Sequence, residues 1–318
     1  MYKLIRFYNQ NRKKILKIIL IIVFIIGIIQ LFNYLTKVNR EKSFEKSDVI
    51  SNSNETGKEI VSNKSAVSGE SISSVKLKND VDVINEFLKY CNEGNINSAY
   101  GLLTNECKEV MFPTIEDFNN IYYSKIFNGE NKSYTVENWV EDTYQVRITG
   151  DILSTGKLDN NETKQDYITI VDQNGEDKLN INNYIGRKNL EKTTEYKNIE
   201  INVLSKDTYM DYEIYNLNIS NNSENTILLD TGESTKSIYL LDSKDVKYYF
   251  YSNEIVQNRL LVQSKYNNTI QIKFSNSYSS SRNIKYLVFS KLILNYDEYK
   301  KLDDKSSYID SYEFRVNV

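Results

Sequence analysis

The stretch Val83-Ile-Asn-Glu-Phe-Leu-Lys-Tyr-Cys-Asn-Glu-Gly-Asn-Ile-Asn-Ser-Ala-Tyr-Gly-Leu-Leu-Thr-Asn-Glu106 decides the fold of the first half of this 318-residue chain. Apolar residues recur between Val81 and Cys91 at the spacing of one helix face, which predicts a helix over residues 81–93. Gly94 stands where such a helix ends. The apolar residues that follow Asn97 predict a second, short helix.

The sequence after this stretch changes from a helical to a strand period. Pro113 breaks the chain, and Thr114-Ile-Glu-Asp117 is a capping-box-like start of a further helix. Alternating apolar residues then predict strands over 134–140, 144–153, 166–172 and 178–184. Helices followed by an antiparallel meander predict an α+β domain, which we place at residues 79–188.

This opening resembles that of extracytoplasmic domains with the nuclear transport factor 2-like fold. The resemblance rests on a helix, a glycine-containing turn, Ala99-Tyr-Gly-Leu-Leu103, and a helix that starts after a proline. It implies three helices packed into a curved sheet around a cone-shaped pocket. Members of that fold include enzymes, small-molecule binders and assembly modules, so the resemblance indicates a fold and leaves the function open.

The last part of the chain, residues 192–318, predicts an all-β domain. Short alternating runs such as Ile199–Val203, Tyr215–Ile219 and Ile270–Phe274 are separated by polar turns. Seven or eight such strands predict a β-sandwich, similar in pattern to the immunoglobulin-like domains of surface proteins. The cysteine pair and strand tryptophan of antibody domains are absent from it.

The start of the chain predicts a membrane anchor. Residues 15–35 are almost wholly apolar, and such a run is long enough to cross a bilayer as a helix. No small-residue cleavage site follows it, so we expect an uncleaved single-pass anchor rather than a signal peptide. Residues 36–78 are serine-rich and predict a flexible tether.

Charge predicts the orientation of this anchor. Residues 1–14 carry basic residues and no acidic ones, whereas the chain as a whole has a net charge of −3. The positive-inside rule therefore places residues 1–14 in the cytoplasm and residues 36–318 outside the cell. The external part is acidic, so we expect no nucleic-acid partner.

Composition excludes several classes of chemistry. The chain has no histidine and two cysteines, which excludes a serine–histidine–aspartate triad and histidine-ligated metal sites. We find no catalytic constellation, and we expect no metal, no cofactor and no enzymatic activity. Cys91 and Cys107 are candidates for a disulfide, with two unpaired core cysteines as the alternative.

The cone-shaped pocket implied by the resemblance is the best candidate site. Its candidate lining residues are Tyr100, Tyr122, Tyr123, Trp139 and Arg147. A binding site needs apolar walls with a few converging polar groups, which these residues offer. The alternative is that they fill the core between helices and sheet.

The sequence thus predicts a non-enzymatic interaction or scaffold module of a bacterial cell envelope, bound to protein or cell-wall partners and able to self-associate. Its composition, rich in Asn, Ile, Lys and Tyr, indicates a low-GC Gram-positive bacterium. One alternative is a subunit of a conjugation or type IV secretion machine, because the architecture of tail, span, tether and external domain is similar to the bitopic scaffold proteins of those machines. Another is a small-molecule binder or enzyme that uses the cone pocket.

Overall fold

The computed structural model describes residues 49–54, 57–62, 64–150, 163–230, 236–249, 260–278, 282–308 and 311–318. The expected cytoplasmic tail, the expected membrane span and the first part of the expected tether lie outside these residues. Among the described residues, no helix has the length and apolar character to cross a bilayer. The chain is mixed α+β, and its named strands pair antiparallel.

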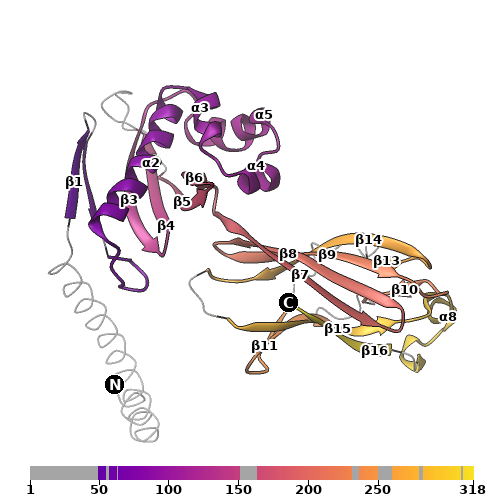
Figure 1. The fold of residues 1–318 in the computed structure, drawn as a ribbon. Coiled ribbons are helices and arrows are strands. Elements are labelled where there is room, and N and C mark those ends of the chain that lie inside the picture. Colours follow the sequence, from indigo (N-terminus) through magenta and orange to yellow (C-terminus); the bar gives the residue numbers. More distant parts are fainter. Residues whose placement is uncertain are drawn as a thin grey trace, which may run out of the picture.

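Helices and a four-stranded sheet build the first half of the chain (Figure 1). The helical elements are α2 (Ser74–Asn92), α3 (Ile96–Gly101), α4 (Asn105–Met111), α5 (Ile115–Phe118), the π-helical segment η1 (Asn119–Tyr123) and α6 (Ser124–Ile126). The sheet has the order β3-β4-β5-β6, with β3 (Lys132–Val140), β4 (Thr143–Gly150), β5 (Lys164–Gln173) and β6 (Glu176–Asn180). We call residues 64–180 the helix–sheet unit.

Two further sheets build the second half, residues 184–318, which we call the sandwich unit. One has the order β14-β9-β8-β7, with β7 (Tyr184–Tyr196), β8 (Ile199–Tyr209), β9 (Tyr212–Asn221) and β14 (Tyr266–Ser275). The other has the order β12-β11-β15-β10-β13, with β16 also paired to β15. Its elements are β10 (Ile227–Leu228), β11 (Ile238–Asp242), β12 (Lys247–Tyr249), β13 (Leu261–Val262), β15 (Ile284–Ile293) and β16 (Ser311–Asn317), and α8 (Tyr296–Lys301) and η3 (Lys305–Ser307) lie between β15 and β16.

Each unit has its own buried core. In the helix–sheet unit, aromatic rings of Phe87, Phe112, Phe118 and Tyr122 contact one another between the helices and the sheet. In the sandwich unit, β8 and β9 alternate between buried and half-buried residues, and Ile199–Val203 of β8 and Tyr215–Ile219 of β9 turn one face to a core of mostly aliphatic side chains. The two cores thus differ in composition as well as in architecture.

Side-chain caps fix where the helices of the first unit begin. The Ser73 hydroxyl accepts from the Lys76 backbone N–H at the start of α2, and Thr104 accepts from Cys107 at the start of α4. Thr114 and Asp117 form both hydrogen bonds of the capping box predicted from the sequence. These caps satisfy backbone donors that a helix start leaves unpaired.

Residues 36–78 were expected to form a flexible tether, but the second part of this segment contains strands and the start of a helix. β1 (Val49–Asn54) and β2 (Gly57–Ser62) form an antiparallel hairpin, and α2 begins at Ser74 instead of near residue 81. The longer helix has a physical reason, because Leu77 extends its buried face by one turn and Ser73 caps it. The start of α2 could not be recognised from the sequence because the residues around it are rich in serine.

The strand expected over residues 178–184 is divided between two sheets. β6 ends at Asn180, and Asn182 and Asn183 adopt φ angles of 60° and 63° before β7 starts at Tyr184. Asparagine tolerates this left-handed conformation better than most residues, so it suits a sharp turn here. The boundary expected between residues 188 and 192 consequently falls inside β7.

The short helix α8 is absent from the sequence-based expectation, which placed strands alone in this half. Asn295 caps it by accepting from the Glu298 N–H, and acidic residues occupy its first turn. Its Tyr299 is buried against the core of the sandwich unit. The capping signal was therefore present in the sequence.

Candidate functional site

The structure does not gather the five expected pocket residues at one place. Tyr100, Tyr122 and Tyr123 lie on the helical elements. Trp139 and Arg147 lie on β3 and β4. The helix-facing side of β4 consists of Tyr144, Val146 and Ile148, so Arg147 points to the other face of the sheet.

The interior expected to be a pocket is filled around Tyr122 by other rings. Phe118 stacks on Tyr122 with ring centroids 5.7 Å apart and an interplanar angle of 17°. Phe87 and Phe112 contact the same ring at 6.1 Å each. Tyr122 itself is 1% exposed, so it forms part of a packed core.

A buried carboxylate lies at the end of this ring cluster. The Tyr122 hydroxyl donates to Asp166 Oδ2 at 2.7 Å, and the backbone N–H groups of Asn182 and Asn183 donate to the same carboxylate at 3.1 and 2.9 Å. Burial raises the pKa of Asp166, and these donors partly oppose that shift. Burial also raises the pKa of Tyr122, which keeps the phenol protonated as a donor.

A second carboxylate–tyrosine pair joins α2 to the sheet. The Tyr144 hydroxyl donates to Asp80 Oδ2 at 2.6 Å, and Lys76 Nζ lies 3.4 Å from the same oxygen. Burial raises the pKa of Asp80, although the hydrogen bond from Tyr144 and the charge of Lys76 oppose this. Both pairs connect a helical element to a strand, so their geometry fastens the two layers of the unit together.

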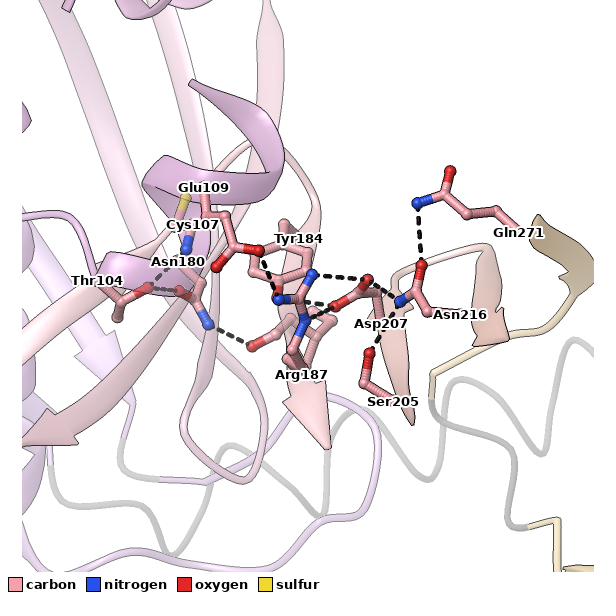
Figure 2. A network of polar contacts seen from close by, with 11 residues as sticks. Thr104, Cys107, Glu109, Asn180, Tyr184, Arg187, Ser205, Asp207, Asn216 and Gln271 are labelled. Carbon is pink, nitrogen blue, oxygen red and sulfur yellow. Dashed lines mark hydrogen bonds and ion pairs between the residues drawn. The ribbon is translucent and has the colours of Figure 1, made fainter. Parts of the chain in front are cut away.

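A network of polar contacts lies where the helix–sheet unit meets the sandwich unit (Figure 2). Arg187 on β7 donates to both oxygens of Asp207 on β8, at 2.7 Å from Nε and 3.2 Å from NH2. Its remaining NH1 donates to Glu109 on α4 at 2.9 Å. One guanidinium group therefore binds a carboxylate from each unit.

Asp207 is the centre of this network. It is 2% exposed, and Asn216 Nδ2 also donates to its Oδ2 at 2.7 Å. The Tyr184 hydroxyl lies 3.3 Å from its Oδ1. The hydrogen bonds to Asp207 raise the pKa of Arg187, which stays charged in any case. We call Glu109, Tyr184, Arg187, Asp207 and Asn216 the junction network.

Aromatic contacts accompany the junction network. Tyr184 meets Tyr209 at 5.2 Å, and Tyr209 stacks on Tyr212 at 4.2 Å. Tyr184 and Tyr209 belong to the buried cluster of the helix–sheet unit although they lie on strands of the sandwich unit. Tyr278 makes a second connection, because its hydroxyl donates to Glu141 at 3.0 Å. The two units therefore share buried surface as well as polar contacts.

The outer face of the first sheet carries the remaining expected residues. Trp139 contacts Tyr167 at 5.3 Å, and Arg147 pairs with Glu137 at 3.3 Å. The side chain of Arg147 is 46% exposed, as expected for a residue on a solvated sheet face.

The two cysteines are free thiols in the structure, and both are buried. Burial raises the pKa of Cys107 to about 12, which keeps it a neutral thiol. Among the described residues, no group of three metal-ligating side chains lies close enough to hold an ion.

No family model, curated protein or solved structure matches this chain in the three comparisons that we made. Sequence reasoning found Tyr122 and missed its partner Asp166, and it missed the junction network altogether. The available signal was a charged residue, such as Asp207, within a strand in which apolar and polar residues otherwise alternate.

Proposed function

We propose that this chain is a membrane-anchored, extracytoplasmic and non-enzymatic interaction module of a bacterial cell envelope. The observation that carries the proposal is the junction network, in which Arg187 binds Asp207 and Glu109 at once. A module of this kind works by presenting two surfaces in a fixed relation, and a bidentate guanidinium–carboxylate pair is a means of fixing them.

The fold supports the same proposal. Helices packed on a four-stranded antiparallel sheet agree with a nuclear transport factor 2-like cone, and two antiparallel sheets around one core agree with an immunoglobulin-like sandwich. Both architectures occur in interaction modules and in proteins with other functions. The function therefore has to be inferred from the site and not from the fold.

The chemistry of the buried carboxylates supports a non-enzymatic role. Asp80 and Asp166 are each held by a tyrosine hydroxyl that fastens a helical element to a strand. The ring cluster occupies the interior where a substrate would bind in a cone-shaped pocket. A small-molecule binder or enzyme is therefore the less supported alternative.

Protease protection tests the proposed topology. In intact cells stripped of their wall, an external protease should digest residues 36–318 of the full-length chain and spare an N-terminal tag. Digestion that requires membrane lysis would contradict the external placement.

In-cell crosslinking of the tagged full-length chain tests the proposed function. We expect defined envelope proteins or wall fragments to be recovered, and we expect Asp207→Ala to reduce the recovery because it loosens the junction. Glu313→Gln is the matched control, since this carboxylate pairs locally with Arg315 on β16. Recovery of secretion ATPases and pore subunits would assign the module to a conjugation machine. Equal recovery with the wild type, Asp207→Ala and Glu313→Gln would contradict a role for the junction network in partner binding.

A further inference from the structure

Three chemically complementary side chains meet at one end of the sandwich unit. Lys206 lies on β8, Glu213 on β9, and Asn276 directly follows β14. These strands are neighbours in the order β14-β9-β8, so the glutamate lies between the lysine and the asparagine. Phe274 pairs with Glu213 and Tyr215 pairs with Lys206 across the ladder, which places this cluster on the core-facing side of the sheet.

Both nitrogen-bearing side chains contact the same carboxylate oxygen. Lys206 Nζ lies 3.5 Å from Glu213 Oε2, and Asn276 Nδ2 lies 3.3 Å from that atom. The two nitrogens are thus separated by no more than the sum of these distances. An amine and a carboxamide that both contact one carboxylate supply the three groups needed to form an amide bond between side chains.

Burial distinguishes this cluster from the exposed ion pairs of the chain and makes it as buried as the Arg187–Asp207 pair. The Glu213 side chain is 2% exposed and that of Lys206 is 27% exposed. In the pair Lys265–Glu224 the corresponding values are 56% and 84%. Glu213 Oε1 is also buried, with no hydrogen-bond partner among the described residues. Buried ions lose hydration, so an environment of this kind favours a reaction that consumes the charge pair.

The neighbouring tyrosine strengthens this conclusion. Tyr215 is 2% exposed, and burial together with the charge of Glu213 raises its pKa. The phenol therefore stays neutral beside the carboxylate and supplies no competing negative charge.

We propose that Lys206 and Asn276 become joined by an isopeptide bond, with Glu213 as the proton carrier. Glu213 accepts a proton from the Lys206 ammonium, and the neutral amine attacks Cγ of Asn276. A bond forms between Nζ and Cγ, and the bond between Cγ and Nδ2 breaks. Of the two protons lost from Nζ, one goes to the leaving nitrogen, which departs as ammonia, and the other stays on Glu213, so that both charges of the buried pair are removed. No oxidant, metal or cofactor is consumed.

The bond would connect two strands that are not neighbours. It spans β9 and closes a covalent loop between β8 and the end of β14. Lys206 directly precedes Asp207 of the junction network, so the bond would fix β8 next to the residue on which the junction depends.

The intact mass of the purified full-length chain tests the proposal. The chain should be lighter than its sequence mass by about 17 Da, the mass of ammonia. Digestion should release one peptide that contains both Lys206 and Asn276. A mass equal to the sequence mass would overturn the proposal without the need for any variant.

Single substitutions locate the reaction. Lys206→Arg, Asn276→Ala and Glu213→Gln should each show the mass calculated from their own sequence. Lys178→Arg is the matched control, since Lys178 pairs with the exposed Glu176, and it should keep the loss. A cyclised Asn174–Gly175 step would also lose ammonia, so a deficit that maps to that peptide, or that persists in Glu213→Gln, would contradict the assignment.

Discussion

Two buried aspartates are held in opposite ways in the two regions of this molecule. Asp166, inside the helix–sheet unit, is surrounded by neutral donors, namely the Tyr122 hydroxyl and backbone N–H groups. Asp207, on β8 where the sandwich unit meets the helix–sheet unit, binds the guanidinium of Arg187 with both oxygens. The two side chains are equally buried, at 3% and 2% exposure. Neutral donors hold the carboxylate between the helices and the sheet of one unit, whereas the carboxylate at the junction is held by a guanidinium that also contacts Glu109 of the other unit.

Removal of the junction carboxylate should have the largest effect. Asp207→Ala leaves the Arg187 guanidinium partly buried without its main partner, and such a loss costs about 3–5 kcal/mol of unfolding free energy. Urea unfolding followed by circular dichroism measures this loss. Asp177→Ala, at an exposed hairpin position, is the control and should be near neutral. A loss for Asp207→Ala as small as that of the control would mean that the junction contributes little to stability.

Removal of one neutral donor should have an intermediate effect. Tyr122→Phe deletes the hydroxyl that donates to Asp166, and an unsatisfied buried acceptor costs about 1–3 kcal/mol. Tyr123→Phe is a control on the adjacent residue, which is also buried and donates no hydrogen bond that the structure records. If both variants lose the same stability, the carboxylate of Asp166 does not depend on that hydroxyl.

The raised pKa of Asp80 should be visible in the pH dependence of the unfolding free energy. Burial raises its folded-state pKa above the value of 3.8, so its contribution to stability is complete below that pH and is lost as the pH rises through the folded-state pKa. The side chain introduced by Asp80→Asn does not titrate. The unfolding free energy of this variant minus that of the wild type should therefore increase as the pH rises through this window. Parallel urea titrations of the two chains measure the difference, in which all other groups cancel. A difference that falls with rising pH would contradict the raised pKa.

The exposed arm of the junction network should have the smallest effect. Glu109 pairs with Arg187, but 69% of its side chain is exposed, and exposed ion pairs contribute about 0–1 kcal/mol. Glu109→Gln should therefore lose little stability, and the loss should shrink further at high salt. Unfolding at low and high salt measures it. A loss comparable to that of Asp207→Ala would mean that the junction depends on the contact between the units rather than on the buried pair.

Much of the architecture could be predicted from local patterns, and the contacts between units could not. Periodicity between Val81 and Cys91 indicated a helix, and alternation indicated most strands of the sandwich unit. The start of α2 was missed because Ser73 lies in a serine-rich segment, where its capping role has no distinguishing spacing. Asn182 and Asn183 divide an apparent strand through backbone conformation, which alternation does not encode.

The candidate site was predicted in part, through residue type. Tyr122 was identified as an interior aromatic residue, but Asp166 follows it by 44 positions, and nothing in the sequence connects them. Arg187 and Asp207 face each other because of irregular register between β7 and β8 and within β8 at Val203 and Ser205. A β-bulge of this kind changes which face a residue occupies, so a strict period of two assigns such residues to the wrong face.

Calorimetric unfolding of the full-length chain tests most directly the claim that the junction makes the two units one body. We expect a single cooperative transition for the helix–sheet unit and the sandwich unit of the wild-type chain, and we expect Asp207→Ala to divide it into two. Two separate transitions in the wild type would show that the units unfold independently and would contradict the account.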